Sequence, residues 1–185
     1  MSDNTFYFGE ILQSFGFDLT DPNLIETPQR MTRVLEELLY GHSAEASIEL
    51  DCLVKKTFPA TLDELIIIRN ITAVGVCPHH FLPVSYTMNI GYIPNTEKCI
   101  GLSKLPRIAK LLARRAVLQE TLCSDLAKFL MDNLNPLGVA VHLVGVHSCM
   151  TLRGVKETNG DMVTTALLGC MRNPESKQEF LQMIH

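Results

Sequence analysis

The chain has 185 residues, enough for one sizeable domain or for a domain with a helical appendage. Its formal net charge is −4 and its pI is ≈ 5.8, which excludes a general electrostatic attraction to nucleic acid. No apolar run approaches the roughly 18 residues that a membrane-spanning helix needs. Charged residues make up 19% and hydrophobic residues 46%, which indicates either a compact core or apolar surface buried between subunits.

The cysteines and the first residues favour a reducing compartment. Polar residues follow Met1, without the apolar segment of a secretory signal. The six cysteines are then not a disulfide framework, and the sequence predicts a cytoplasmic protein. Four cysteines have no histidine or second cysteine at ligand spacing, and we interpret them as structural: Cys52, Cys99, Cys123 and Cys170.

Helical patterns dominate the first 47 residues. Apolar side chains between residues 6 and 17 form a loose face. A second helix is expected with Thr27 as its N-cap, Pro28 in its first turn and Gly41 just after its last turn. We therefore treat residues 1–47 as an N-terminal helical segment and residues 48–185 as the main domain.

From about residue 48 to residue 93, the pattern favours strands. The expected elements from there on are strands at 65–68 and 84–93, helices from Ser103 and over 118–134, strands at 139–146 and 162–168, and a helix over 174–184. Gly145 and Gly154 are expected at bends or bulges. Strands do not alternate with single helices, so the sequence predicts an α+β fold with helices packed on one face of an antiparallel sheet.

Two distant segments carry residues that can bind a metal. Cys77-Pro78-His79-His80 and His147-Ser148-Cys149 each supply one cysteine and at least one histidine. Cys77, His80 and Cys149 form a three-ligand zinc set, which leaves the fourth tetrahedral position open, as in catalytic sites. The alternative is that these residues are only packed or exposed side chains.

Two further histidines accompany this set. Adjacent residues on extended backbone point to opposite sides, so His79 can face elsewhere while His80 binds metal, provided that the backbone bends near Pro78. If residues 147–149 lie on a strand, His147 faces the same side as Cys149, as a proton donor or acceptor or as a second metal ligand. We interpret His42, His142 and His185 as incidental.

A basic group and a carboxylate complete the candidate site. Lysine and arginine side chains near a helix start are suited to phosphate, and the candidates are Arg30, Lys104, Arg107, Arg114, Arg115 and Arg153. Each by itself is more typical of a solvated surface. Glu120, next to Gln119, could accept hydrogen bonds from a guanine edge or could be an ordinary surface residue.

The order and spacing of these residues resemble the GTP cyclohydrolase I family from about residue 24 to the C-terminus. The matching segments are Thr27–Arg30, Cys77–His80, Gly91–Pro94, Gly101–Arg107, Gln119–Glu120 and His147–Gly154. The resemblance implies a tunnelling fold (T-fold), in which strands of several subunits form a barrel. It also implies a homodecamer of two pentamers with active sites between subunits.

The implied activity is hydrolysis of GTP to 7,8-dihydroneopterin triphosphate and formate, with one Zn²⁺ per subunit lowering the pKa of a water that attacks C8. Cys77, His80 and Cys149 match the family's zinc ligands. His79, His147 and Ser103 match its catalytic residues. The substrate positions are Gln119 and Glu120 for guanine, and Lys104, Arg107, Arg153 and Arg30 for the triphosphate, with Arg30 expected from a neighbouring subunit.

Pro78 departs from the family pattern, which has Glu at this position. The absence of a glutamate would remove a hydrogen-bonding partner close to the metal ligands, and the proline in its place would stiffen the backbone. A divergent paralogue that binds GTP or pterin with little or no turnover is therefore an alternative, as is a purely structural zinc. A zinc nucleobase deaminase is disfavoured, because the chain has neither Pro-Cys-x-x-Cys nor His-x-Glu.

Overall fold

The computed structural model describes residues 3–60, 63–95 and 98–184. The helices are α1 (Asp3–Ser14), α2 (Thr27–Leu38), α3 (Ala44–Val54), α4 (Lys104–Ala113), α5 (Gln119–Leu134), α6 (Ser148–Thr151) and α7 (Pro174–Ile184), with 3₁₀ turns η1 (Tyr40–His42) and η2 (Cys170–Arg172). The strands are β1 (Thr57–Phe58), β2 (Ile66–Val76), β3 (Pro83–Ile93), β4 (Cys99–Ile100), β5 (Gly138–His147) and β6 (Met162–Gly169). His185 lies outside the described residues.

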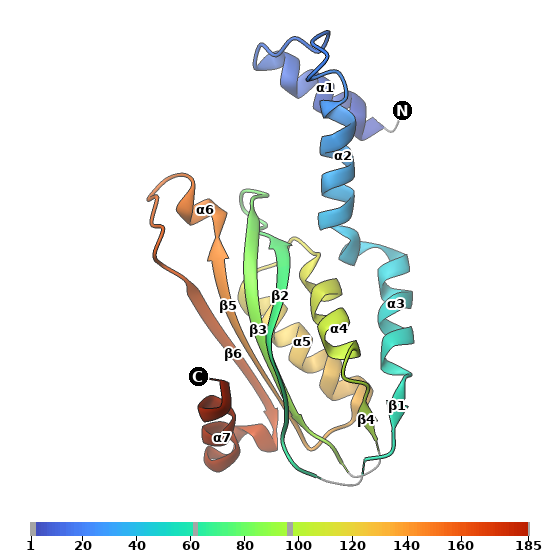
Figure 1. Ribbon diagram of the computed structural model, residues 1–185, viewed down its shortest axis with the longest axis vertical. Helices are drawn as coiled ribbons and strands as arrows, with labels where there is room; N and C mark the ends of the chain where they lie inside the picture. Colours follow the sequence, from blue (N-terminus) through green and yellow to red (C-terminus); the bar gives the residue numbers. More distant parts are fainter. Residues whose placement is uncertain (1–2, 61–62, 96–97, 185) are drawn as a thin grey trace.

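Four antiparallel strands form the main sheet, in the order β2-β3-β5-β6 (Figure 1). β3 and β5 pair without interruption from Val84↔His147 to Ile93↔Gly138. Helices α4 and α5 cover one face, and the side chains beneath them are fully buried: Met88, Ile90, Val141 and Leu143. The expected α+β architecture, with an antiparallel sheet and helices packed on it, is confirmed.

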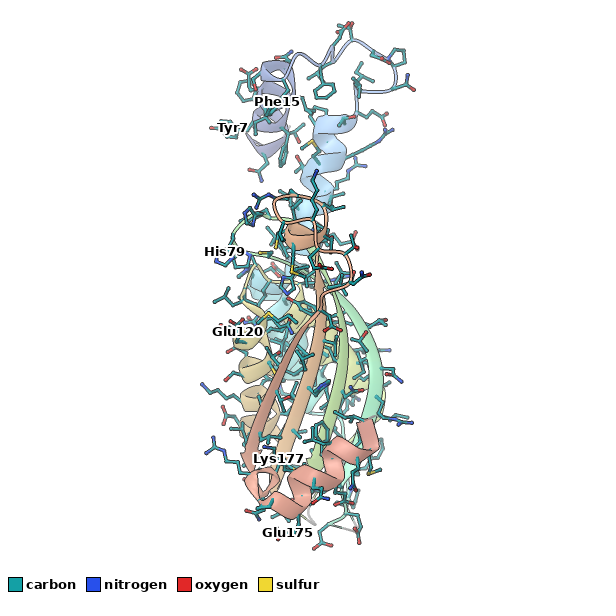
Figure 2. All side chains as sticks on the ribbon, turned by 90° about the vertical axis from the view of Figure 1, so that its left-hand side faces the viewer. Tyr7, Phe15, His79, Glu120, Glu175 and Lys177 are labelled. Atoms are coloured by element: carbon teal, nitrogen blue, oxygen red, sulfur yellow. The ribbon has the colours of Figure 1, made fainter. Side chains whose placement is uncertain are left out.

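Helix α7 packs on the other face, at the end of the sheet away from α6 (Figures 1 and 2). One cross-strand row lies in this region: Ile67, Gly91, Ala140 and Leu167 are successive partners in the register. Phe180 of α7 is completely buried against it, and a Cβ on Gly91 would lie 2.9 Å from Phe180 Cδ2. The two small residues in the middle of the row therefore make room for the phenylalanine ring.

Helices α1 and α2 extend beyond the end of the sheet as a separate arm (Figure 1). Apolar side chains on this arm remain exposed, and Tyr7 and Phe15 have relative accessibilities of 61% and 78% (Figure 2). The predicted caps of α2 were wrong. The N-cap is Glu26 instead of Thr27, because Thr27 already has helical geometry, and Gly41 lies inside η1. Pro28 is in the first turn, as predicted.

Helix α3 was not predicted, and the expectation of strand character from residue 48 was wrong for residues 48–54. The helix has a local start signal, because the Ser43 hydroxyl accepts a hydrogen bond from the Ala46 N–H at 3.0 Å. Ala46 and Leu53 are buried in the cluster under α4, so one stripe of α3 joins the main core. The helix runs across residues 47 and 48, between which the sequence predicted the domain boundary.

The glycine expectations had mixed outcomes. Gly145 pairs regularly with Tyr86 and Met162, so the predicted bend or bulge is absent there. Gly154 adopts a φ of +63°, as expected for a turn. The register shift in the sheet lies between Ile68 and Ile71 of β2. No helix in the described part of the chain combines the length and the apolar character needed to cross a bilayer.

Candidate active site

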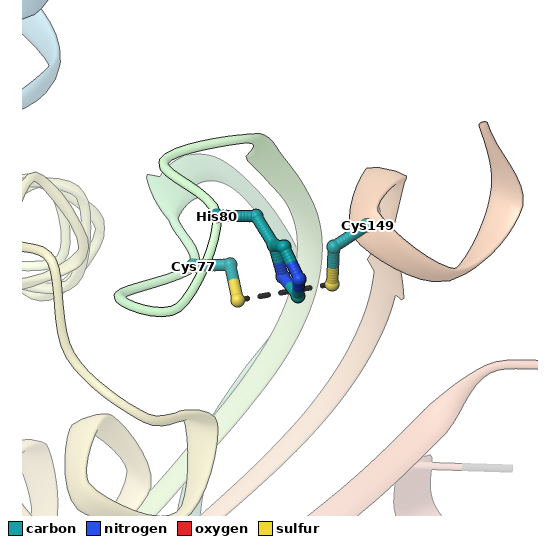
Figure 3. A group of neighbouring side chains, drawn as sticks. All are labelled: Cys77, His80 and Cys149. Atoms are coloured by element: carbon teal, nitrogen blue, oxygen red, sulfur yellow. Dashed lines mark hydrogen bonds between the residues drawn. The ribbon is translucent and has the colours of Figure 1, made fainter. Parts of the chain in front are cut away.

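The predicted metal ligands meet at one end of the sheet. Cys77 and His80 lie in the turn between β2 and β3, and Cys149 lies in α6, directly after β5 (Figure 3). The turn bends sharply, because the Phe81 N–H donates to the Cys77 carbonyl at 2.9 Å and Phe81 has a φ of +53°. The predicted bend near Pro78 is therefore present. Cys149 lies in the helical turn α6, so the prediction that His147 and Cys149 share one face of a strand was wrong.

The geometry of the three side chains suits zinc. Their ligand atoms all lie within 4.8 Å of one another, and the two Sγ atoms are 3.7 Å apart. Two Zn–S bonds of about 2.3 Å at a tetrahedral angle place the sulfurs about 3.8 Å apart. Among the described residues, no other group of three potential His, Cys, Asp or Glu ligands is this compact. Burial and the adjacent Cys77 raise the pKa of Cys149, so metal binding has to displace a proton there.

Arg153 contacts the histidine of this set. Its Nη1 donates a hydrogen bond to His80 Nε2 at 2.8 Å. A neutral imidazole has one nitrogen lone pair available in the ring plane, and a guanidinium only donates. The hydrogen bond and a metal bond at His80 therefore compete for that lone pair, so metal binding would release Arg153.

His147 lies beside the metal ligands, at the end of β5. Its Nε2 is 2.9 Å from Gln119 Oε1, and its ring meets the edge of Tyr86 with a centroid distance of 6.4 Å. Burial lowers the pKa of His147, while the charge of nearby Glu120 opposes this shift. Burial, with Cys77 and Glu120 nearby, raises the pKa of Tyr86 to about 12. The imidazole is therefore neutral near pH 7 and the phenol remains protonated.

Glu120 lines a pocket between α5 and β6. The pocket has a volume of ≈ 400 Å³ and its lining includes Glu120, Ser124, Thr164 and Arg172. Glu120 is exposed, whereas Gln119 is 1% exposed. Figure 2 shows Glu120 below His79 on the same side of the molecule. Thr164 and Arg172 carry no sequence motif, and only the pairing of β5 with β6 places them here.

Four predicted residues lie away from this cluster within the chain. Ser103, Lys104 and Arg107 are at the start of α4, which follows β4. The Ile100 N–H in β4 donates to the Tyr92 hydroxyl at 3.3 Å, so the start of α4 is near the far end of β3. Arg30 is on the arm and forms an exposed ion pair with Glu26 at 2.7 Å.

The remaining cysteines and histidines have local roles or none. Cys123 is buried, its thiol donates to the Val141 carbonyl at 3.5 Å, and burial raises its pKa to about 11. Cys52 is exposed, so burial does not account for it. His42 Nε2 accepts from the Ala116 N–H at 3.0 Å, and His142 lies 3.3 Å from the Asn89 amide nitrogen.

Comparison with known proteins decides the family. The sequence model of GTP cyclohydrolase I matches residues 6–185. The GTP cyclohydrolase 1 of Saccharomyces cerevisiae is 38% identical over 174 residues, which cover 94% of this chain and 70% of the yeast protein. The GTP cyclohydrolase 1 of Thermoanaerobacter pseudethanolicus is 37% identical over 177 residues, which cover 95% of this chain and 92% of that protein.

The chain belongs to the GTP cyclohydrolase I family. A solved structure, the archaeosine synthase QueF-like protein in its apo form, aligns with 57% of this chain and 93% of its own at 18% identity and a TM-score of 0.44. We draw no conclusion from a similarity at that distance.

Within this GTP cyclohydrolase I family member, Pro78 occupies the turn that carries two of the metal ligands. Its ring offers no hydrogen-bond acceptor, in contrast to the glutamate of the family pattern. On the turn itself, the Sγ of Cys77 lies 3.8 Å from His79 Nδ1. Pro78 therefore leaves the orientation of Cys77 to the backbone and to its neighbouring side chains.

Proposed function

We propose that this chain is a zinc-dependent GTP cyclohydrolase. It would open the guanine ring of GTP at C8 and yield formate and 7,8-dihydroneopterin triphosphate. The observation that carries the proposal is the compact Cys77, His80 and Cys149 set in a chain that belongs to this family along nearly its whole length. Because zinc-binding thiolates of this kind persist in reducing surroundings, we place the reaction in the cytoplasm.

The chain's own residues divide the chemistry between them. Zinc held by the three ligands would act as a Lewis acid and activate water in the open fourth position. His147 is neutral near pH 7 and can accept a proton at its Nδ1, because its Nε2 faces Gln119. His79, exposed on the same turn as His80, is assigned to proton transfer during ring opening.

We assign the pocket at Glu120 to the purine. The exposed carboxylate of Glu120 can accept two hydrogen bonds, one from the N1–H and one from the amino group of guanine. Gln119 is assigned to the same end of the site, behind Glu120. Arg153, once released from His80, can contact the triphosphate as a charge-assisted donor.

The two halves of the proposed site are too far apart to serve one substrate within one chain. The metal ligands lie beside the Val84 end of β3, and the start of α4 lies near its Ile93 end. Nine residue steps along a strand span roughly 30 Å, longer than a nucleoside triphosphate. We therefore infer that Ser103, Lys104 and Arg107 act in the site of a neighbouring subunit, and that Arg30 does so from the arm.

A shared site requires an oligomer, and we propose the family's homodecamer of two pentamers. The exposed apolar side chains of the arm and the open edges of β2 and β6 are surfaces that such an assembly can bury. Ser103 would act there in the later rearrangement of the ribose.

Mixed oligomers test the shared site. Cys149→Ser subunits lack a metal ligand, and Lys104→Ala subunits lack a phosphate contact, so each homo-oligomer should be inactive. In a co-expressed hybrid, random mixing makes about a quarter of the sites whole, and the hybrid should recover activity on that order. A hybrid as inactive as its parents contradicts the shared site. A hybrid of Cys149→Ser with Cys77→Ser, whose changes both fall on the metal set, is the matched control.

Formate release from GTP tests the function itself. Purified protein with one zinc per subunit should release formate stoichiometrically with a pterin that becomes fluorescent on oxidation. Zinc-loaded protein that binds GTP without releasing formate would instead support the binding-only alternative, which Pro78 favours. In that case Pro78→Glu should raise turnover sharply.

A further inference from the structure

We propose that Gln119 is a positioning residue that fixes the tautomer of His147, so that Nδ1 of this histidine is the proton acceptor toward the substrate. The proposal rests on the proposed function for its catalytic meaning, but the tautomer itself is a property of the folded chain. In this role the Gln119 side chain positions His147 and does not contact guanine directly.

The first step is the orientation of the Gln119 amide. Its nitrogen Nε2 lies 2.8 Å from the Met162 carbonyl oxygen and 3.4 Å from the Leu143 carbonyl oxygen. Carbonyl oxygens only accept hydrogen bonds, so the NH₂ group of the amide has to face them. The flipped amide would point its own oxygen at both carbonyls and is excluded. The Thr164 hydroxyl, 3.2 Å from the same nitrogen, can accept as well.

The orientation of the Gln119 amide determines which nitrogen of His147 carries the hydrogen. With the NH₂ group committed to β5 and β6, the atom that faces the imidazole is Oε1, at 2.9 Å from Nε2. An amide oxygen only accepts, so Nε2 of His147 has to carry the hydrogen. In the neutral ring, Nδ1 then holds the free lone pair. A partner on one nitrogen thus sets the chemistry of the other.

The third step is the rigidity of this arrangement. Gln119 is 1% exposed, and its amide packs directly against the backbone of Gly145. A Cβ at residue 145 would overlap Gln119 Oε1 and would lie 3.0 Å from its Cδ and 3.1 Å from Tyr86 Cε1. The Tyr86 ring stands nearly perpendicular to the imidazole, at an interplanar angle of 88°. Gln119 and Tyr86 therefore hold the ring from two sides.

Two substitutions of Gln119 separate positioning from substrate contact. Gln119→Met keeps the volume but removes both the acceptor for His147 and the donors for the carbonyls. Gln119→Glu keeps an acceptor oxygen toward His147 Nε2, and its second oxygen carries a proton that donates to the Met162 carbonyl in place of the amide NH₂. In the zinc-loaded full-length enzyme, we expect Gln119→Met to lower kcat about 10- to 100-fold with little change in KM, the range for a misplaced catalytic group. Gln119→Glu should retain more of kcat than Gln119→Met.

The tautomer has its own readout. In ¹⁵N NMR of histidine-labelled, zinc-loaded protein at neutral pH, His147 should show a protonated Nε2 and an unprotonated Nδ1. Comparison with His147→Asn assigns the signals. Gln119→Met should give a mixture of tautomers, whereas Gln119→Glu should keep Nε2 protonated, because an oxygen of residue 119 still accepts from it. Gln178→Met, on an exposed position of α7, is the matched control and should change neither readout.

The outcomes are distinct. A wild-type His147 with protonated Nδ1 overturns the proposal, whatever the activity. So does a Gln119→Met enzyme in which KM rises and kcat is unchanged, because Gln119 would then bind substrate. If the wild-type protein releases no formate but shows the expected tautomer, the proposed function fails while the assignment of Gln119 stands. If Gln119→Met does not fold, the wild-type and Gln119→Glu spectra still decide.

Discussion

Replacing Gly145 by alanine should disable the site without touching a metal ligand or the substrate. Gly145 lies two residues before His147 on β5, and the position that a Cβ would occupy faces Gln119 and Tyr86. An added methyl group overlaps Gln119 Oε1 and presses on Gln119 Cδ at 3.0 Å and on Tyr86 Cε1 at 3.1 Å. Because both neighbours are buried, neither can swing into solvent.

The size of the effect follows from the displacement. To restore ordinary contact distances, the Gln119 amide has to shift by roughly 1 Å, and a misplacement of that size costs about 100-fold in rate. Overpacking of a buried position destabilises by about 1–3 kcal/mol, which leaves a protein of ordinary stability folded. We therefore expect a folded, zinc-binding Gly145→Ala protein whose kcat is about 100-fold lower.

The assay combines formate release, zinc content and thermal unfolding at one protein concentration. Gly9→Ala is the control, because its methyl group meets Leu19 only at an ordinary 3.7 Å. The decisive comparison uses Gln119→Ala as the background, where the overlap with Gln119 is gone and only the contact with Tyr86 Cε1 at 3.1 Å remains, so Gly145→Ala should add less than about a threefold loss. An equal loss in both backgrounds, or an undiminished kcat in the single variant, would refute the reasoning.

Three further predictions concern other parts of the chain. In folded protein, iodoacetamide should label the exposed Cys52 quickly and Cys123 hardly at all, because Cys123 is buried and its pKa is raised to about 11; mass spectrometry of the digested protein checks this. Phe180→Ala should lower the free energy of unfolding by about 3–5 kcal/mol in denaturant titrations, because the small residues beneath the ring cannot fill its cavity, whereas the exposed Met183→Ala should cost little. Arg153→Ala should raise zinc affinity a few-fold in competition with a chelator, since no guanidinium then competes for the imidazole lone pair, and a lower affinity would contradict that view.

Sequence patterns predicted β3, β5, α4 and α5 closely, but only the first part of β2, which runs from Ile66 to Val76 where a strand was expected at 65–68. Helices α4 and α5 each bury one face, which imposes a helical period on the sequence, and the central strands β3 and β5 are buried over most of their length, which makes them continuous apolar runs. Helix α3 was not predicted, because its apolar residues are few and its start depends on the single N-cap residue Ser43. The cap of α2 was misplaced by one residue, which local side-chain preferences alone do not resolve.

For the site, the sequence by itself determined which atoms can bind zinc, because the affinity of thiolate and imidazole for the metal belongs to the residues themselves. Tertiary structure decided their spacing, through the pairing of Val84 with His147 that brings the β2–β3 turn beside α6. It also decided that the start of α4 lies at the other end of the sheet. The nitrogen that His147 offers depends on Gln119, 28 residues away, because a tautomer is set by a hydrogen-bond partner that only the fold supplies.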